Sequence, residues 1–539
     1  MKKAYKCFYG ICLLGCLTAC SDWDEHYGTA GTTDAAEGTV SLWQQIKANP
    51  DLSDFAQVLE ETKIFRQHRK TPVSYADLLD GGQSFTVVAP VNGTFDKDAL
   101  LEMVQTAQGD SVVEKSFVQN HLSRSLSSVT KEDKRVLLLN MKYAEYADGM
   151  IEGVTITSPN QRARNGVLHV AASQIPYERN LYETLRDDEL LSGIGAALHR
   201  YDEDYFDADN SISSGIVEGV PVYVDSVIIE RNRMLDRLGY INREDSLYWV
   251  VAPTKDAWQQ VWEETSQYFV YDESVLKRDS LQHHWTTAAL MQDAIFNMHI
   301  QEDITDSIVS VPYVRSVPQP GKPVYHVFYN PLEEGGVLYG GEPIQCSNGV
   351  VYKTDTWPYA PEQTFFRQMW CETENFSNII EEKMCTYNTR WLAADSISSG
   401  AYLQILPEKA TSNWELTFRI PNTLSACYDI YAVVLPRTIT HTDETFKPCK
   451  FKATINYVDE KGDKQSFNCG NTQFKADPAR IDTVLLAEAF HFPACNYDQT
   501  GSKVSVKLQC SILPREQANY SREMYLDCIY LRPRKMNNE

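Results

Sequence analysis

The sequence predicts a multidomain protein, with two mixed α/β domains followed by an antiparallel β-sandwich of the jelly-roll type. Three observations predict this order. One strand-and-helix pattern occurs twice in the earlier part of the chain, short alternating apolar runs fill the later part, and cysteine usage changes between the two. The length of 539 residues fits about three domains.

The clearest repeated segment is FTVVAPVNGTF at Phe85–Phe95, which returns as SLYWVVAPTKDAW at Ser246–Trp258. In both copies a short apolar run ends in Ala-Pro. Proline donates no ladder hydrogen bond and restricts the residue before it, so each run is predicted to be a strand that ends there.

Two further segments repeat in the same order. NGVLHV at Asn165–Val170 returns as NGVVYK at Asn348–Lys353, and Asn-Gly before alternating apolar residues predicts a tight turn and then a strand. The helix predicted from Leu42, with Ser41 as its N-cap, aligns without a gap on the segment from Leu181. Apolar positions fall on apolar positions throughout, so we infer an internal duplication.

These residues resemble the fasciclin domain, a module of adhesion and matrix proteins. The resemblance implies two mixed α/β fasciclin-like domains, at residues 41–176 and 177–359, the second with insertions. The first copy matches the family motif well, with His121 and His169 at motif positions. We expect both to be core histidines that form hydrogen bonds between segments. The second copy departs from the motif, with Tyr352 in place of the second histidine.

Residues 360–539 are predicted to form the C-terminal β-sandwich. Seven strand-length runs separated by polar turns are typical of an antiparallel sandwich. The ending YLDCIYLRP at Tyr525–Pro533 is similar to the last strand of jelly-roll domains of the galactose-binding type. Nine of the 13 cysteines lie from Cys346 onward, and those inside strand-like runs are expected to be buried free thiols.

The N-terminal segment resembles a bacterial lipoprotein signal. A basic start and a short apolar run end in Leu-Thr-Ala before Cys20, so residues 1–19 are predicted to be a signal peptide and Cys20 the acylated, for example palmitoylated, residue. Residues 20–40 are predicted to be a tether, whose acidic start resembles the surface-export signal of Bacteroidetes lipoproteins. We therefore expect a lipid-anchored protein of the outer membrane, exposed at the cell surface. The alternative is an ordinary secretory signal that contains cysteines.

Charge and motifs exclude several functions. The net charge of −23 argues against nucleic acid as a partner. No nucleophile elbow, P-loop, dinucleotide fingerprint or zinc-protease motif is present, so we predict no catalytic residues, no cofactor and no metal site. The acidic segment Asp202–Ser211 is expected to be a solvated loop. The spacing of a calcium loop is matched by Asp207, Asp209, Ser211, Ser213 and Glu218, but Ile212 stands where that loop needs glycine.

Aromatic residues in loop-like settings are the candidate ligand-binding residues. Trp357, Trp391 and Tyr497 could each offer a ring face to a sugar, although each could equally be a packing residue. Trp414 alternates with Leu416 and Phe418 and is expected in the core.

The leading hypothesis is a non-enzymatic accessory protein of an outer-membrane glycan or nutrient uptake system. Its partners would be a glycan or protein ligand, and a TonB-dependent transporter with its lipoprotein partner. The alternative is an adhesin that binds host matrix or other cells through the fasciclin-like domains. A third hypothesis, a hydrolase within the sandwich, requires a cleft with two facing carboxylates.

Overall fold

The computed structural model describes residues 38–66, 69–125, 133–217, 220–297, 307–310, 313–314, 323–439, 447–470, 473–501 and 503–535. The predicted signal peptide, Cys20 and most of the tether lie outside these ranges. Within them, no helix combines the length and apolarity needed to cross a membrane. The chain divides into two compact units, the first with residues up to Arg179 plus Phe206–Ile229, and the second with Asn180–Tyr205 and Glu230 onward.

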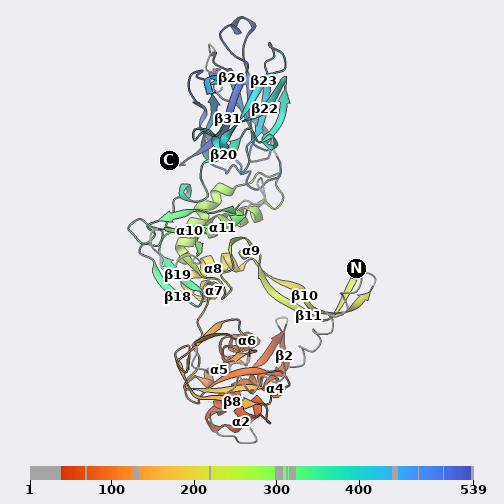
Figure 1. The fold of residues 1–539 in the computed structure, drawn as a ribbon, viewed down its shortest axis with the longest axis vertical. Coiled ribbons are helices and arrows are strands. Elements are labelled where there is room, and N and C mark those ends of the chain that lie inside the picture. Colours follow the sequence, from red (N-terminus) through yellow and green to blue (C-terminus); the bar gives the residue numbers. More distant parts are fainter. Residues whose placement is uncertain are drawn as a thin grey trace, which may run out of the picture. The chain divides into compact units, whose positions relative to one another are not determined.

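The first unit consists of short helices and one large sheet (Figure 1). Its helical segments are α2 (Leu42–Ala48), η1 (Pro50–Leu52), α3 (Ser53–Glu61), α4 (Tyr75–Asp80), α5 (Lys97–Met103), α6 (Ala107–Val113), the π-helical turn η2 (Glu114–Val118) and η3 (Gln119–His121). Ser41 caps α2 as predicted, because its side chain accepts from the Gln44 N–H and the Gln44 side chain accepts from the Ser41 N–H.

Seven strands form the sheet of the first unit, in the order β4-β3-β9-β8-β7-β6-β5. They are β3 (Phe85–Pro90), β4 (Leu122–Ser123), β5 (Lys134–Leu137), β6 (Tyr143–Ala147), β7 (Met150–Ile151), β8 (Val154–Ala163) and β9 (Gly166–Ala171). Strands β3 and β9 are parallel and buried along their whole length, which explains their continuous apolar runs. A separate hairpin pairs β1 (Lys63–Arg66) with β2 (Arg69–Ser74).

The second unit begins with the same construction. Helices α7 (Leu181–Asp187), η4 (Glu189–Leu191) and α8 (Ser192–His199) precede a sheet in the order β13-β12-β19-β18. Its strands are β12 (Tyr248–Pro253), β13 (Ile295–Asn297), β18 (Glu342–Cys346) and β19 (Gly349–Thr354), and β12 pairs with β19 in parallel. Helices α9 (Leu235–Leu238), α10 (Lys255–Ser266), η5 (Gln267–Phe269) and α11 (Arg278–Gln292) complete the described helices of this part.

The repeated Asn-Gly motif has the same structural role in both copies. Asn165 Oδ1 accepts from the Leu42 N–H at 2.8 Å, and Asn348 Oδ1 accepts from the Leu181 N–H at 2.8 Å. The amide Nδ2 of Asn165 donates to three backbone carbonyls and that of Asn348 to two. Each motif therefore ties the first helix of its copy to the start of the central strand pair, which supports the inferred duplication.

The glycines of this motif are required by close backbone approach. A Cβ on Gly166 would lie 1.9 Å from the Phe85 carbonyl oxygen, and one on Gly349 would lie 1.9 Å from the Tyr248 carbonyl oxygen. Both also have positive φ, at 153° and 145°. Only glycine fits these two positions.

The later part of the second unit is an antiparallel sandwich, as predicted. One sheet has the order β22-β23-β31-β25-β29, with β20 also paired to β31; its strands are β20 (Met369–Glu372), β22 (Cys385–Trp391), β23 (Ala401–Pro407), β25 (Cys427–Leu435), β29 (Asp482–His491) and β31 (Met524–Arg534). The other has the order β21-β24-β30-β26-β27, with β28 paired to β26; its strands are β21 (Ile379–Lys383), β24 (Glu415–Arg419), β26 (Lys450–Val458), β27 (Lys464–Asn468), β28 (Phe474–Lys475) and β30 (Ser505–Cys510).

The sandwich core confirms two predictions from the sequence. Trp414 is fully buried, and its Nε1–H donates to the Arg522 carbonyl at 2.6 Å. Cys510 and Cys528 are buried free thiols within strands, and Cys427 is a half-buried free thiol in β25.

Buried contacts join the sandwich to the domain before it within the second unit. Tyr497 packs against Phe269 and Trp285, and the Tyr271 hydroxyl donates to the Tyr497 carbonyl at 3.0 Å. The fully buried Asp272 side chain forms an ion pair with Lys503 at 2.6 Å. These contacts give the two parts one continuous hydrophobic core.

One expectation requires correction, and two features were not predicted. The segment expected as a solvated acidic loop begins the long strand β10 (Asp202–Val217), paired with β11 (Val220–Asn232). The segment from Val112 to Leu122 is divided among α6, η2 and η3, because its hydrogen bonding changes from α to π and then to 3₁₀. The hairpin β1–β2 was not predicted.

Candidate functional site

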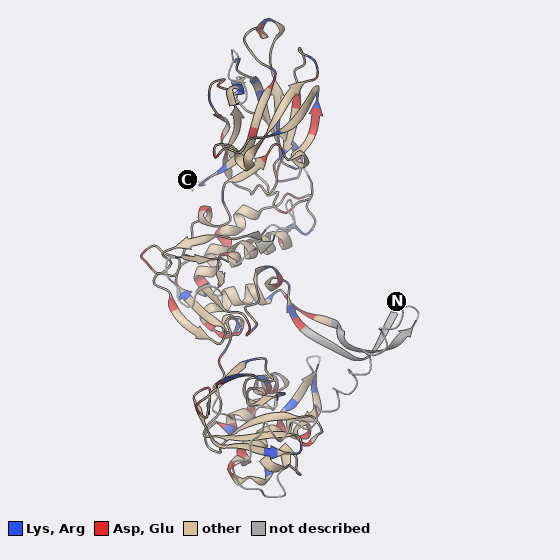
Figure 2. Cartoon of the chain, viewed as in Figure 1, with Lys and Arg blue, Asp and Glu red and all other residues tan. Residues whose placement is uncertain are grey.

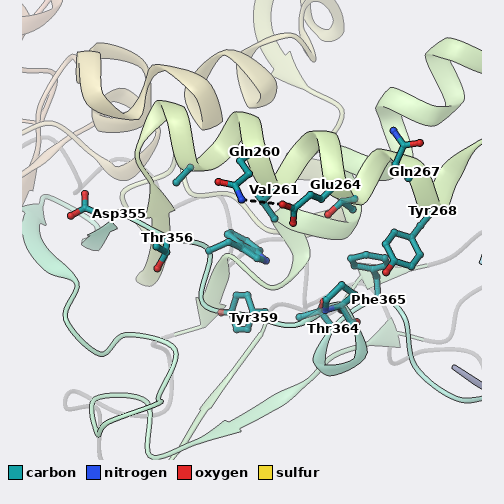
Figure 3. Close-up of a pocket in the computed structure, with 14 residues that line it drawn as sticks. Gln260, Val261, Glu264, Gln267, Tyr268, Asp355, Thr356, Tyr359, Thr364 and Phe365 are labelled. Carbon is teal, nitrogen blue, oxygen red and sulfur yellow. Dashed lines mark hydrogen bonds between the residues drawn. The ribbon is translucent and has the colours of Figure 1, made fainter. Parts of the chain in front are cut away.

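The second unit contains a cleft with a volume of about 510 Å³. One wall is helix α10 with the following turn η5, and the other is the segment from Asp355 to Phe365, which leads from β19 into the sandwich (Figure 3). The cleft therefore uses residues on both sides of the predicted boundary at residues 359 and 360. A volume of this size falls within the range of small-molecule sites, about 300–1,000 Å³.

Helix α10 presents a stripe of mixed apolar and polar residues to the cleft, because its opposite face is anchored in the core. Trp258 is buried on that core face. The residues that line the cleft follow helical spacing, at Ala257, Gln260, Val261 and Glu264. Gln260 Nε2 donates to Glu264 Oε1 at 3.0 Å, and Figure 3 shows both side chains directed from α10 toward the opposite wall.

The opposite wall is held in place by Tyr359. Its ring is buried between Trp357 and Phe328, with centroid separations of 5.0 Å to each. Its hydroxyl donates to the Asp293 carbonyl at 2.6 Å, and burial raises the pKa of Tyr359 well above its usual value. Trp357 is thereby supported from behind while its ring lines the cleft.

A second pair of rings closes the other end of the cleft. Tyr268 and Phe365 meet edge to face at a centroid separation of 5.3 Å, and both line the cleft (Figure 3). The adjacent Phe366 is 1% exposed and packs against Tyr428 of the sandwich at 5.3 Å. The aromatic surface of the cleft is therefore fixed to two hydrophobic clusters, one around Tyr359 and one that includes Phe366 and Tyr428.

The charge within the cleft is entirely negative. Among its lining residues, Glu264 and Asp355 carry carboxylates and none carries a basic side chain. Glu362 follows the lining residue Pro361, and its buried Oε2 atom has no hydrogen-bond partner among the described residues. Burial, followed by the charges of Glu362 and Glu264, raises the pKa of Tyr268.

These groups suit recognition of a ligand with apolar faces and hydroxyl groups. Trp357, Tyr268 and Phe365 offer ring surfaces, while Gln260, Thr356 and Thr364 add amide and hydroxyl groups.

The structure does not bring the predicted ligand-binding residues together. Trp357 lines the cleft. Trp391 lies at the end of β22, outside the cleft, with its side chain 80% exposed. Tyr497 packs against Phe269 and Trp285, as described above, and Cys20 lies outside the described residues.

The two motif histidines are core residues, as predicted. Burial lowers the pKa of His121 to about 4, and its neutral ring joins two segments by accepting from the Ile175 N–H at 2.9 Å and contacting the Phe117 carbonyl at 2.7 Å. His169 Nδ1 accepts from the Asn160 N–H at 3.0 Å.

Outside the cleft, two carboxyl groups of the sandwich have raised pKa values. Burial raises the pKa of Glu374 to about 7 and that of Asp527 to about 6, in each case with a smaller contribution from nearby Glu372. Asp527 accepts from the Ser398 N–H. Over the described ranges, no group of three or more His, Cys, Asp or Glu side chains is arranged to hold a metal ion.

The functional groups of the cleft that were missed from the sequence are those of Gln260, Glu264, Tyr268, Asp355, Thr356, Thr364 and Phe365. Gln260 and Glu264 are typical of any solvated helix face, and the two aromatic residues are indistinguishable from core residues by spacing. Only the approach of α10 to residues 355–365 identifies them.

The sequence matches no protein-family model and no curated protein. Among solved structures, the chain is similar to the CBM22-1–GH10 modules of endo-1,4-β-D-xylanase 10B from Clostridium thermocellum, in complex with xylohexaose. The identity is 8% and the TM-score 0.21, over 31% of this chain and 28% of that chain. The chain thus spans under a third of the xylanase modules.

Two further similarities cover nearly all of the matched protein. The CBM22-1 xylan-binding domain of Xyn10C from Paenibacillus barcinonensis matches with 12% identity and a TM-score of 0.21, over 32% of this chain and 95% of that chain. A FAS1 domain pair from the insect cell adhesion molecule fasciclin I matches with 8% identity and a TM-score of 0.18, over 60% of this chain and 97% of that chain. At these TM-scores the similarities assign no function, and membership of the fasciclin family stays a prediction.

Proposed function

We propose that this protein is a non-enzymatic carbohydrate-binding protein, and that the cleft between α10 and residues 355–365 is its binding site. The observation that carries the proposal is the combination of supported ring faces with amide and hydroxyl groups in one cleft of about 510 Å³. Pyranose rings have an apolar C–H face and polar edges, and such a cleft meets both requirements.

Charge supports the same ligand class. The net charge of −23 disfavours polyanions such as nucleic acids. Lys and Arg are interspersed with Asp and Glu over the described part of the chain in Figure 2, and the cleft itself contains no basic side chain. Sugars without acidic groups are compatible with this environment.

The N-terminal sequence supplies the proposed location. Acylation of Cys20 would anchor the protein in the outer membrane, and the acidic residues that follow would direct it to the cell surface. There it would hold glycan as an accessory of an uptake system with a TonB-dependent transporter and its lipoprotein partner. Labelled palmitate should be incorporated into the wild-type protein and not into Cys20→Ser. Protease added to intact cells should digest the wild-type protein.

Binding is tested by glycan-array screening and calorimetry with the purified protein and three tryptophan variants. Trp357→Ala should weaken binding by about 1–3 kcal/mol, or about 5- to 150-fold. Trp391→Ala is the matched control, because that side chain is 80% exposed and lies outside the cleft. Trp357→Phe should retain part of the affinity, and melting temperatures verify folding of each variant.

Three outcomes decide between the hypotheses. Glycan binding that depends on Trp357 and not on Trp391 supports the proposal. Binding that depends on Trp391 instead refutes the assignment of the site. No glycan binding, together with attachment to matrix proteins or cells, refutes the proposed function in favour of adhesion.

A further inference from the structure

The charge of the cleft indicates which kind of sugar it would prefer. A site that tolerates any neutral sugar needs only ring faces and hydrogen-bonding groups. This cleft adds two carboxylates from opposite walls, Glu264 on α10 and Asp355 after β19, and no lining residue balances them (Figure 3).

Two further observations concern negative charge next to the cleft. The pKa of Tyr268 is raised by burial and then by the charges of Glu362 and Glu264, so these carboxylates influence a ring that lines the site. The Glu362 Oε2 atom is buried and lacks a protein partner among the described residues.

The aromatic rings add to the same preference. A cation near the face of a Trp or Tyr ring is attracted by the ring quadrupole, most strongly for Trp. Trp357 and Tyr268 both line the cleft that holds the carboxylates. A ligand with a positive charge beside an apolar sugar face would therefore use the carboxylates and the rings together.

We infer that the cleft selects cationic amino sugars, meaning 2-amino-2-deoxy sugars with a free ammonium group, over their neutral and acidic counterparts. This inference rests on the proposed carbohydrate-binding function. It specifies the ligand class of the same cleft, with Glu264 and Asp355 as the specificity-determining residues.

The test compares sugars that differ only at one substituent. Glucose, galactose and mannose are each titrated beside the 2-amino-2-deoxy sugar of the same configuration and the corresponding uronic acid, at about pH 6 where the amine is protonated. We expect the amino sugars to bind about three- to tenfold more tightly than the neutral sugars at low salt, because exposed ion pairs are individually weak. The preference should shrink in 0.5 M salt through screening.

Helix α10 offers a matched pair of variants. Gln259 donates to Glu263 at 3.0 Å and Gln260 donates to Glu264 at 3.0 Å, so the same pair occurs twice, one residue apart, and only the second lines the cleft. Glu264→Gln with Asp355→Asn should remove the preference for amino sugars while neutral sugars still bind. Glu263→Gln should leave the preference unchanged.

The outcomes separate this inference from the proposed function. Equal binding of amino and neutral sugars, both lost in Trp357→Ala, overturns the preference and leaves the carbohydrate site intact. A preference that survives Glu264→Gln with Asp355→Asn overturns the assignment to these carboxylates. Absence of binding by all nine sugars overturns the preference, and absence of binding by every glycan of the array as well overturns both.

Discussion

The ion pair between Asp272 and Lys503 should stabilise the junction that holds the cleft. The Asp272 side chain is fully buried, and its Oδ2 lies 2.6 Å from Lys503 Nζ. Burial alone would raise the pKa of Asp272, but the hydrogen bonds and charge of Lys503, together with Ser274, outweigh it and lower that pKa. The carboxylate is therefore held ionised in a buried position.

The perturbation is Lys503→Met, which keeps the aliphatic stem and removes the ammonium group. Asp272 would then retain only Ser274, whose N–H donates at 3.1 Å and whose hydroxyl also donates. Removing one member of a buried pair costs about 3–5 kcal/mol. Because 23% of the Lys503 side chain is exposed and water would replace part of the contact, we expect a loss of about 2–3 kcal/mol.

Lys507→Met is the matched control; Lys507 lies on β30, which begins two residues after Lys503. Lys507 lies 4.0 Å from Glu415 in a more exposed pair, so its loss should change stability by less than about 0.5 kcal/mol. Calorimetric unfolding of the full protein gives the stability change. Hydrogen exchange should show faster exchange at Glu273 and Cys495, whose N–H groups bond across the junction to the carbonyls of Glu460 and Val270.

The reasoning is refuted if Lys503→Met and Lys507→Met have the same unfolding temperature and the same exchange at the junction. The variant with both Asp272→Asn and Lys503→Met should be more stable than Lys503→Met alone, because no unpaired charge stays buried.

Two further predictions concern the repeated motif and a buried carboxyl group. Gly349→Ala should destabilise the second unit by at least about 2 kcal/mol, since its Cβ would meet the Tyr248 carbonyl, whereas Gly501→Ala, with open space around its Cβ, should be neutral in the same thermal assay. Burial raises the pKa of Glu114 to about 7 from an ordinary value of 4.5, so its stabilising contribution is complete below about pH 4.5 and is lost as the pH rises through 7. The melting temperature of Glu114→Gln relative to that of the wild type should therefore increase from pH 5 to pH 8. A difference that does not change with pH would contradict this.

Local signals in the sequence predicted much of the fold. Ser41 marked the start of α2, and the paired Asn-Gly motifs marked the starts of β9 and β19. Alternation placed Trp414 in the sandwich core. Each of these features depends on a few neighbouring residues, which is why the sequence alone was sufficient.

The features missed from the sequence depend on tertiary contacts. The acidic start of β10 was expected to be a solvated loop because its residues have low β propensity. It is a strand because pairing with β11 outweighs that propensity. Trp357 was selected for its loop-like setting, but Gln260 and Glu264 gained significance only because α10 packs opposite that loop. Tyr497 had the same loop-like setting as Trp357, and its packing against Trp285 depends on how the sandwich meets α11.

The most direct test of the central claim is hydrogen exchange of the full protein with and without the oligosaccharide that binds most tightly in the array. The account predicts that added protection is confined to residues 257–268 and 355–365, which line the cleft, and that it disappears in Trp357→Ala. Protection around Trp391 or elsewhere in the sandwich, with none in these two segments, would contradict it.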